Sequence, residues 1–346
     1  MLTAVWTLSL VLIAASLLAA IALVLRRMIT DRRAKTTNAV RKQLLTALVW
    51  FSNDGNTAKL LTALRHAPPH IVADAITEFL ALVRGDDRET IIAALHRFGL
   101  PEFLARVLKK GSQPRRFHAA ELLAAFPAHV AIPHLQEALD ADPSQDVRLA
   151  AAMALADLQA LPPLSLIMAR LGRGEQYSWR LNDLFRRLPT ERADELERIA
   201  MAEDAPDLVR SAAIDALVPI RGMYAREQFE ALAAAPSPTV AGAAIRALGY
   251  VGDSNSSEVL AHAMGSSNWD VRADAAEAAG RLGDTALLNR LAGLLNDPVW
   301  AVRYAAAKAM RRAGARGDRL LQEAATCGPP RSQRTASLVL AEGASQ

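Results

Sequence analysis

The chain has 346 residues, of which 51% are apolar but only 5% aromatic, and its formal net charge is +4. The apolar content excludes a disordered chain, and the single cysteine, Cys327, excludes both a disulfide framework and a zinc site built from several cysteines. Most of the apolar residues are alanine and leucine, which favour helices, so the composition predicts an all-α protein.

The first feature along the chain is an uncharged run at residues 2–25. As a helix, these residues would be about 36 Å long, enough to cross a hydrocarbon core of about 30 Å. No lysine or arginine precedes the run, and it is longer than the apolar part of a signal peptide. We therefore expect residues 1–25 to form an uncleaved transmembrane anchor, with a cleaved signal peptide as the alternative.

A basic segment follows at residues 26–42, with seven lysine and arginine residues against one aspartate. The positive-inside rule predicts a single-pass protein of the inner (cytoplasmic) membrane, with the N-terminus outside and the rest of the chain in the cytoplasm. The segment is expected to lie against anionic lipid headgroups. The remaining chain has slightly more acidic than basic residues, so we predict no nucleic-acid partner.

Residues 43–111 are predicted to be helical. Pro and Gly turns separate the helices, and the pattern does not follow the regular repeat found further on. We interpret this region as degenerate N-terminal repeats that cap the following array and join it to the anchor. The expected helices cover residues 43–51, 56–66, 71–83, 88–99 and 101–110.

From residue 112 onward the sequence repeats with a period of about 31 residues. Each unit has a first helix, a turn with Pro or Asp, and an alanine-rich second helix. Such a pair cannot bury its apolar face alone, so neighbouring units are expected to stack and complete the core. The clearest second helices lie in residues 142–158, 204–220, 266–282 and 297–313, and residues 236–253 share the frame with Ala241 at the position of the recurring arginine.

The recurring pattern D-P-x4-V-R-x2-A-A-x-A-L is best preserved from Asp142 to Arg148 and from Asp297 to Arg303. This pattern resembles the HEAT repeat, in the short form also seen in bacterial and phycobilin-lyase-type proteins. The resemblance implies an α-solenoid of helical hairpins over residues 112–346, here with one N-terminal transmembrane helix. It also implies that the recurring Asp and Arg residues form a structural ladder between units: Asp142, Arg148, Asp204, Arg210, Arg272, Asp297 and Arg303.

No nucleophile elbow, phosphate-binding loop, dinucleotide fingerprint or zinc-protease motif is present in the sequence. Seven histidines are scattered along the chain; His66 and His70 are four residues apart, but Pro68 and Pro69 lie between them, so they do not share a helix face and no metal site is indicated. We therefore predict a protein that is not an enzyme, with no catalytic residue, cofactor, metal or small-molecule substrate.

The second helices should expose a stripe at positions +2, +5 and +9, counted from the recurring arginine. The charges along the stripe are mixed, which suits a protein partner, although a solvated face without a partner is the alternative. Trp269 and Trp300, at matching sites, are either an exposed anchor pair or, slightly favoured, packed between units. The candidate protein-binding residues are Tyr250, Arg246, Arg281, Lys308 and Arg312.

Together these features predict a membrane-tethered scaffold or adaptor that presents a long surface to a membrane-associated protein at the cytoplasmic face. Two enzymatic alternatives follow from the resemblance: a HEAT-like lyase acting on a protein-bound chromophore, and a HEAT-like DNA-repair glycosylase.

Overall fold

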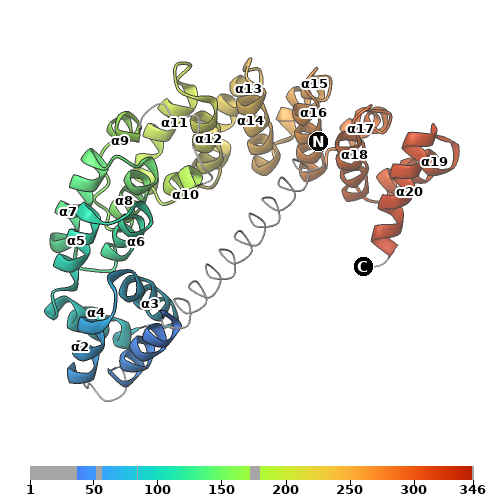
Figure 1. Ribbon diagram of the computed structural model, residues 1–346. Coiled ribbons are helices and arrows are strands. Elements are labelled where there is room, and N and C mark those ends of the chain that lie inside the picture. The colour runs from blue at the N-terminus through green and yellow to red at the C-terminus, as the bar shows by residue number, and fades with distance from the viewer. Residues whose placement is uncertain (1–36, 52–56, 84, 172–179, 345–346) are drawn as a thin grey trace, which may run out of the picture. The chain divides into compact units, whose positions relative to one another are not determined.

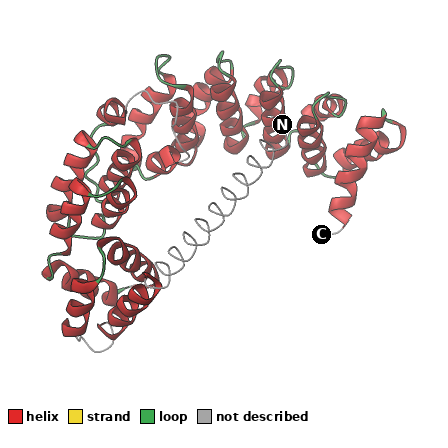
Figure 2. Cartoon of the chain, in the orientation of Figure 1, coloured by secondary structure: helices red, strands yellow, loops and turns green. Residues whose placement is uncertain are grey.

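The computed structural model describes residues 37–51, 57–83, 85–171 and 180–344. Within these ranges the chain consists of helices and loops, with no strand (Figure 2). The expected all-α fold is therefore confirmed. The predicted anchor at residues 1–25 lies outside the described residues, as does most of the basic segment. In the described ranges no helix is both long and apolar enough to span a bilayer. The chain divides into two compact units between Leu158 and Gln159.

In the first unit, all five helices expected between residues 43 and 111 are present. The first covers residues 37–51 and begins earlier than predicted. Helix α5 pairs with α6, α7 pairs with α8, and α6 packs against α8. The remaining elements of this unit are α2 (Thr57–His66), α3 (Pro69–Leu82), α4 (Asp86–Arg97), α5 (Leu100–Lys110), α6 (Gln113–Leu123), α7 (Ala128–Ala141) and α8 (Gln145–Asp157).

The second unit begins with α9 (Leu164–Leu171) and α10 (Arg180–Arg186) and continues as helical hairpins. The second helices α12, α14, α16, α18 and α20 lie side by side in that order, and the first helices pack along them (Figure 1). The hairpins are α11 (Ala193–Met201) with α12 (Asp207–Arg221), α13 (Arg226–Ala233) with α14 (Pro238–Val251), α15 (Ser257–Ala263) with α16 (Trp269–Leu282), α17 (Leu288–Leu294) with α18 (Trp300–Arg312), and α19 (Ala315–Cys327) with α20 (Pro330–Ala344).

In the compact part of the chain after Gln159, small residues allow the second helices of neighbouring repeats to approach closely. A Cβ atom added to Gly249 would lie 2.6 Å from the Cα of Ala278, and one added to Gly280 would lie 2.7 Å from the Cα of Ala309. These distances are shorter than any ordinary carbon–carbon contact, so only glycine fits at the two positions. The small residues of the second helices thus set the spacing between consecutive repeats.

Glycines with positive φ end successive second helices at the same point of the repeat. Gly252, Gly283 and Gly314 have φ angles of 73°, 71° and 74°, a region that only glycine enters without steric cost. Two of them are followed by an aspartate that caps the next turn: the Asn255 N–H donates to Asp253, and the Ala286 N–H donates to Asp284. The same Gly-Asp sequence therefore reverses the chain after α14 and after α16.

Candidate protein-binding surface on α14, α16 and α18

An arginine–aspartate pair connects the repeat of α16 with the repeat of α18. Arg272 on α16 donates from Nε and Nη2 to the two carboxylate oxygens of Asp297, at 2.7 and 3.0 Å, and from Nη1 to the carbonyl of Ser266. Asp297 also accepts the N–H of Val299 at the start of the next second helix. Because both side chains are largely buried, the pair holds the turn before α18 against α16 of the preceding repeat.

The first unit contains the same arrangement. Arg116 donates to both carboxylate oxygens of Asp142, at 2.7 and 3.1 Å, and Asp142 accepts the N–H of Ser144. Arg116 was not among the predicted ladder residues, although it lies in the repeat register, 32 residues before Arg148.

The other predicted ladder residues make different contacts. Arg148 and Arg303 donate to the carbonyls of Asp142 and Asp297, at 2.6 and 2.7 Å, and Arg210 donates to the carbonyl of Ala200. Each of these contacts lies within a single hairpin. Asp204 is exposed, and in the described part of the chain no hydrogen bond to its carboxylate is found. A ladder role for Asp204 thus has no geometric support.

The contacts of Asp297 determine its acidity. Burial raises the pKa of this carboxyl, but the hydrogen bonds from Arg272 and from the Val299 N–H outweigh burial and bring the pKa below its ordinary value of 3.8. The ionised form is therefore favoured in the folded protein.

This shift makes stability depend on pH in acid. Because the folded pKa of Asp297 is lowered, its contribution is fully present above the unfolded pKa and is lost as the pH falls through the folded pKa. We expect the free energy of unfolding to decrease as the pH falls below about 4, the ordinary pKa of an aspartate, and to decrease less in the Asp297→Asn variant. Urea denaturation at each pH measures both. An identical decrease in variant and wild type would contradict the role given to Asp297.

The structure brings two of the candidate binding residues together. The guanidinium of Arg281 lies over the ring of Tyr250, 4.3 Å from its centroid, and also pairs with Glu277 at 3.2 Å. Tyr250 is 63% exposed. An exposed tyrosine held by a cation on the neighbouring helix is a preordered contact surface.

Arg246 links three second helices. It pairs with Asp274 on α16 at 2.8 Å and with Asp215 on α12 at 3.7 Å. Burial raises the pKa of both aspartates, and Arg246 partly offsets this effect. Arg246 therefore connects neighbouring repeats and is also part of the candidate surface.

Lys308 and Arg312 are both exposed on α18. The Lys308 ammonium lies 5.3 Å from the ring centroid of Tyr304.

One expectation about the surface was wrong. At position +2 the side chains of Ala243 and Ala305 are buried, because this side of each second helix faces its neighbour. Positions +5 and +9 are exposed on α18 as expected, at Lys308 and Arg312. Residues four apart lie on one face of an α-helix, and the line continues toward the start of α18 through the half-buried Tyr304 and the exposed Trp300.

The two tryptophans are exposed rather than packed between units, contrary to the slightly favoured expectation. Trp269 is 44% and Trp300 54% exposed. Trp300 stacks on Tyr304, with ring centroids 4.9 Å apart and an interplanar angle of 14°. The Tyr304 hydroxyl donates to Glu342 on α20 at 3.0 Å. Tyr304 was not predicted as a surface residue, although the W-x3-Y spacing is a signal for an aromatic pair on one helix face.

A second line of contacts, also missed, joins the first helices. Glu195 on α11 accepts the N–H of Leu164 at the start of α9 and a hydrogen bond from Arg192, which also donates to the Leu161 carbonyl. The Arg192 hydrogen bond is the main reason that the pKa of Glu195 lies below its ordinary value. Ser257 likewise donates to Asp284 in the next unit.

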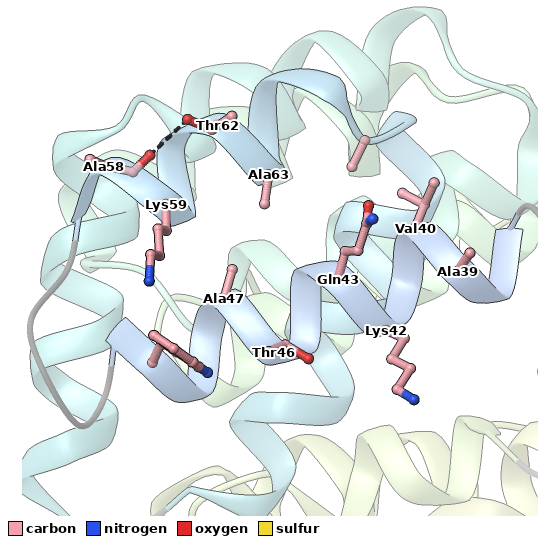
Figure 3. Close-up of a pocket in the computed structure, with 12 residues that line it drawn as sticks. Ala39, Val40, Lys42, Gln43, Thr46, Ala47, Ala58, Lys59, Thr62 and Ala63 are labelled. Carbon is pink, nitrogen blue, oxygen red and sulfur yellow. Dashed lines mark hydrogen bonds between the residues drawn. The ribbon is translucent and has the colours of Figure 1, made fainter.

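The first unit contains an apolar groove of about 920 Å³ between the helix at residues 37–51 and α2 (Figure 3). Ala47 and Ala63 line it from opposite sides, and Lys59 extends from α2 toward Trp50, with its ammonium 3.8 Å from the ring centroid. Across the described ranges, no group of three or more His, Cys, Asp or Glu residues is placed to hold a metal ion. Cys327 is exposed at the end of α19.

Comparisons with known proteins agree with the repeat pattern. A family model described as HEAT repeats matches residues 84–156, 225–311 and 257–338. The first match begins before residue 112, so α4 and α5, which we expected to be degenerate, fall within it. A search of curated proteins gives no match.

Several solved structures are similar in fold. YibA from Escherichia coli has 19% identity and a TM-score of 0.41, over 70% of this chain and 92% of that one. The karyopherin Kap121p bound to the SUMO protease Ulp1p has 15% identity and a TM-score of 0.40, over 88% of this chain and 41% of that one. Human deoxyhypusine hydroxylase has 14% identity and a TM-score of 0.27, over 74% and 99%. These values are too low to indicate a shared function.

Proposed function

Because the chain belongs to the HEAT-repeat family, whose model matches just over half of it, we propose that it is a non-enzymatic scaffold that binds a protein partner at the cytoplasmic face of the membrane. Stacked helical hairpins provide extended surfaces, and such surfaces are typical of protein recognition.

The observation that carries this proposal is the exposed side of α14, α16 and α18. Tyr250 and Arg281 form a stacked pair there, and Lys308 and Arg312 extend the surface on the next helix. Tyrosine and arginine are the residue types that most often dominate the energy of protein interfaces. The mixed charge of this side suits a protein surface better than a phosphate backbone.

We assign the tether to residues 1–42, most of which precede the described residues. Residues 1–25 supply the anchor and residues 26–42 the contact with anionic headgroups, which places residues 43–111 and 112–346 on the cytoplasmic side. Confinement to the membrane would raise the effective concentration of the scaffold near a membrane-associated partner.

The test is a triple substitution of Tyr250, Arg281 and Arg312 by alanine. All three side chains are exposed, so we expect the circular dichroism spectrum and the melting temperature to stay nearly unchanged. Retention of the partner that co-purifies with the full chain from membranes in mild detergent should fall at least about tenfold, the loss of one strong contact in an interface.

The matched control replaces Arg316, Arg319 and Tyr224, which are exposed outside this surface. Equal retention by the triple variant and the wild type would rule out this surface. Recovery of the full chain in the non-membrane fraction would rule out the tether and leave the surface to be judged separately.

A further inference from the structure

An aromatic edge lies at the starts of α16 and α18, formed by the exposed Trp269 and Trp300 and by the half-buried Tyr304. Its two tryptophans occupy the same position in consecutive units, 31 residues apart. Both are about half exposed, and Trp300 is held in place by stacking on Tyr304. The edge is therefore an ordered apolar strip that nothing in the described chain covers.

The spacing of the two tryptophans follows from the packing beneath them. Gly280 on α16 meets the backbone of Ala309 on α18 without room for a side chain. Helices in such close contact have axes about 8–10 Å apart, so equivalent residues on the two helices have about the same separation. A polyproline II helix repeats every three residues, or about 9.3 Å. Prolines three residues apart would therefore meet successive tryptophans.

Carboxylates lie at both ends of the aromatic edge. Asp270 is exposed and adjacent to Trp269 in the sequence. It lies one helical turn before Asp274, on the same face of α16, and Asp274 contacts Arg246 of α14. This face of α16, including Asp270, is therefore turned toward α14. At the other end, Glu342 on α20 accepts the Tyr304 hydroxyl. A ligand lying along the edge would meet a negative charge at each end, and basic residues would complement both.

We infer that the aromatic edge binds an extended segment of the partner protein in which prolines three residues apart are flanked by arginine or lysine. Each proline ring packs on one tryptophan, and the flanking cations pair with Asp270 and Glu342. The polyproline II conformation is largely formed before binding, so little conformational entropy is lost. This inference rests on the proposed scaffold function and names the chemistry of the bound segment.

The test uses the full chain in mild detergent and a fluorescent synthetic peptide of about nine residues, with two prolines three residues apart and arginine at both ends. Two control peptides have the same composition, with prolines two or four residues apart. Fluorescence anisotropy gives each Kd. We expect at least about tenfold tighter binding of the first peptide. Equal affinity for all three peptides would overturn the inference without requiring any variant to fold.

Variants of the chain locate the binding site. The Trp269→Ala, Trp300→Ala double variant should weaken peptide binding at least about tenfold, and Asp270→Asn should weaken binding of the arginine peptide but not of a glutamine-flanked version. Trp50→Ala, at a tryptophan of similar exposure in the first unit, is the matched control. Unchanged binding by the double variant would overturn the inference. If that variant still retains the co-purifying partner, the scaffold function stands and only the aromatic edge is excluded.

Discussion

Replacing Gly280 by alanine is expected to destabilise the protein by about 1–3 kcal/mol, the usual effect of overpacking a close contact. The new Cβ would lie 2.7 Å from the Cα and 2.8 Å from the Cβ of Ala309. Because one of these atoms belongs to the backbone, relief requires α16 and α18 to move apart. The neighbouring contacts along both helices would loosen with them. Denaturation in guanidinium chloride measures the change in the free energy of unfolding.

Gly293 provides the matched control for this substitution. It is exposed in α17, and a Cβ added there would meet nothing within 4 Å. Gly293→Ala should therefore stabilise the protein by about 0.5–1 kcal/mol, because alanine loses less backbone entropy on folding. The two glycine-to-alanine changes are expected to have opposite signs. A stabilising Gly280→Ala would contradict the close contact between α16 and α18.

Replacing Asp297 by alanine is expected to cost about 3–5 kcal/mol, the range for removing one partner of a buried ion pair. The Arg272 guanidinium would lose both of its carboxylate contacts, and the Val299 N–H would lose its acceptor. Arg303→Ala should cost less, about 1–3 kcal/mol, because in the described part of the chain Arg303 donates to main-chain carbonyls, those of Asp297 and Pro298, and not to a carboxylate.

Asp204→Ala is the control for this comparison. Asp204 stands at the corresponding place in its own repeat but is exposed, so its replacement should change the free energy of unfolding by less than about 0.5 kcal/mol. Thermal and urea denaturation of the three variants gives the order of effects. Similar losses in the free energy of unfolding for Asp204→Ala and Asp297→Ala would contradict this role of the ion pair. They would mean that Asp297 stabilises its own turn and that its contact with Arg272 adds nothing.

The repeat architecture could be predicted from the sequence because its signal is local and recurs. The 31-residue spacing of Arg272 and Arg303, followed by alanine pairs, located α16 and α18, and the resemblance to HEAT repeats supplied the way in which they stack. Helices without the repeat pattern, such as α4, could also be recognised from their apolar spacing. Their membership in the family became clear only from the match that begins at residue 84.

The side of each second helix that is exposed was harder to predict. Positions +1 and +2 differ by one residue, and only the approach of the neighbouring helix decides which one is covered. Ala305 is buried by that approach, whereas Tyr304 is only half-buried and stacks on Trp300. Contacts between units, such as that of Glu195 with the Leu164 N–H, join residues 31 apart. No local pattern identifies such a pair.

The glycines with positive φ bear on how a chain of this kind can change in length. The segment from Asp253 to Gly283 begins directly after one left-handed glycine and ends at the next, with nearly the same φ angle. If this whole segment were duplicated or deleted, the new junction would again be a left-handed glycine followed by an aspartate. The backbone conformation at the junction would therefore be one that the chain already adopts. Recombination can therefore lengthen or shorten the array by complete units, and with it the number of partner contacts, while every surviving junction keeps its geometry.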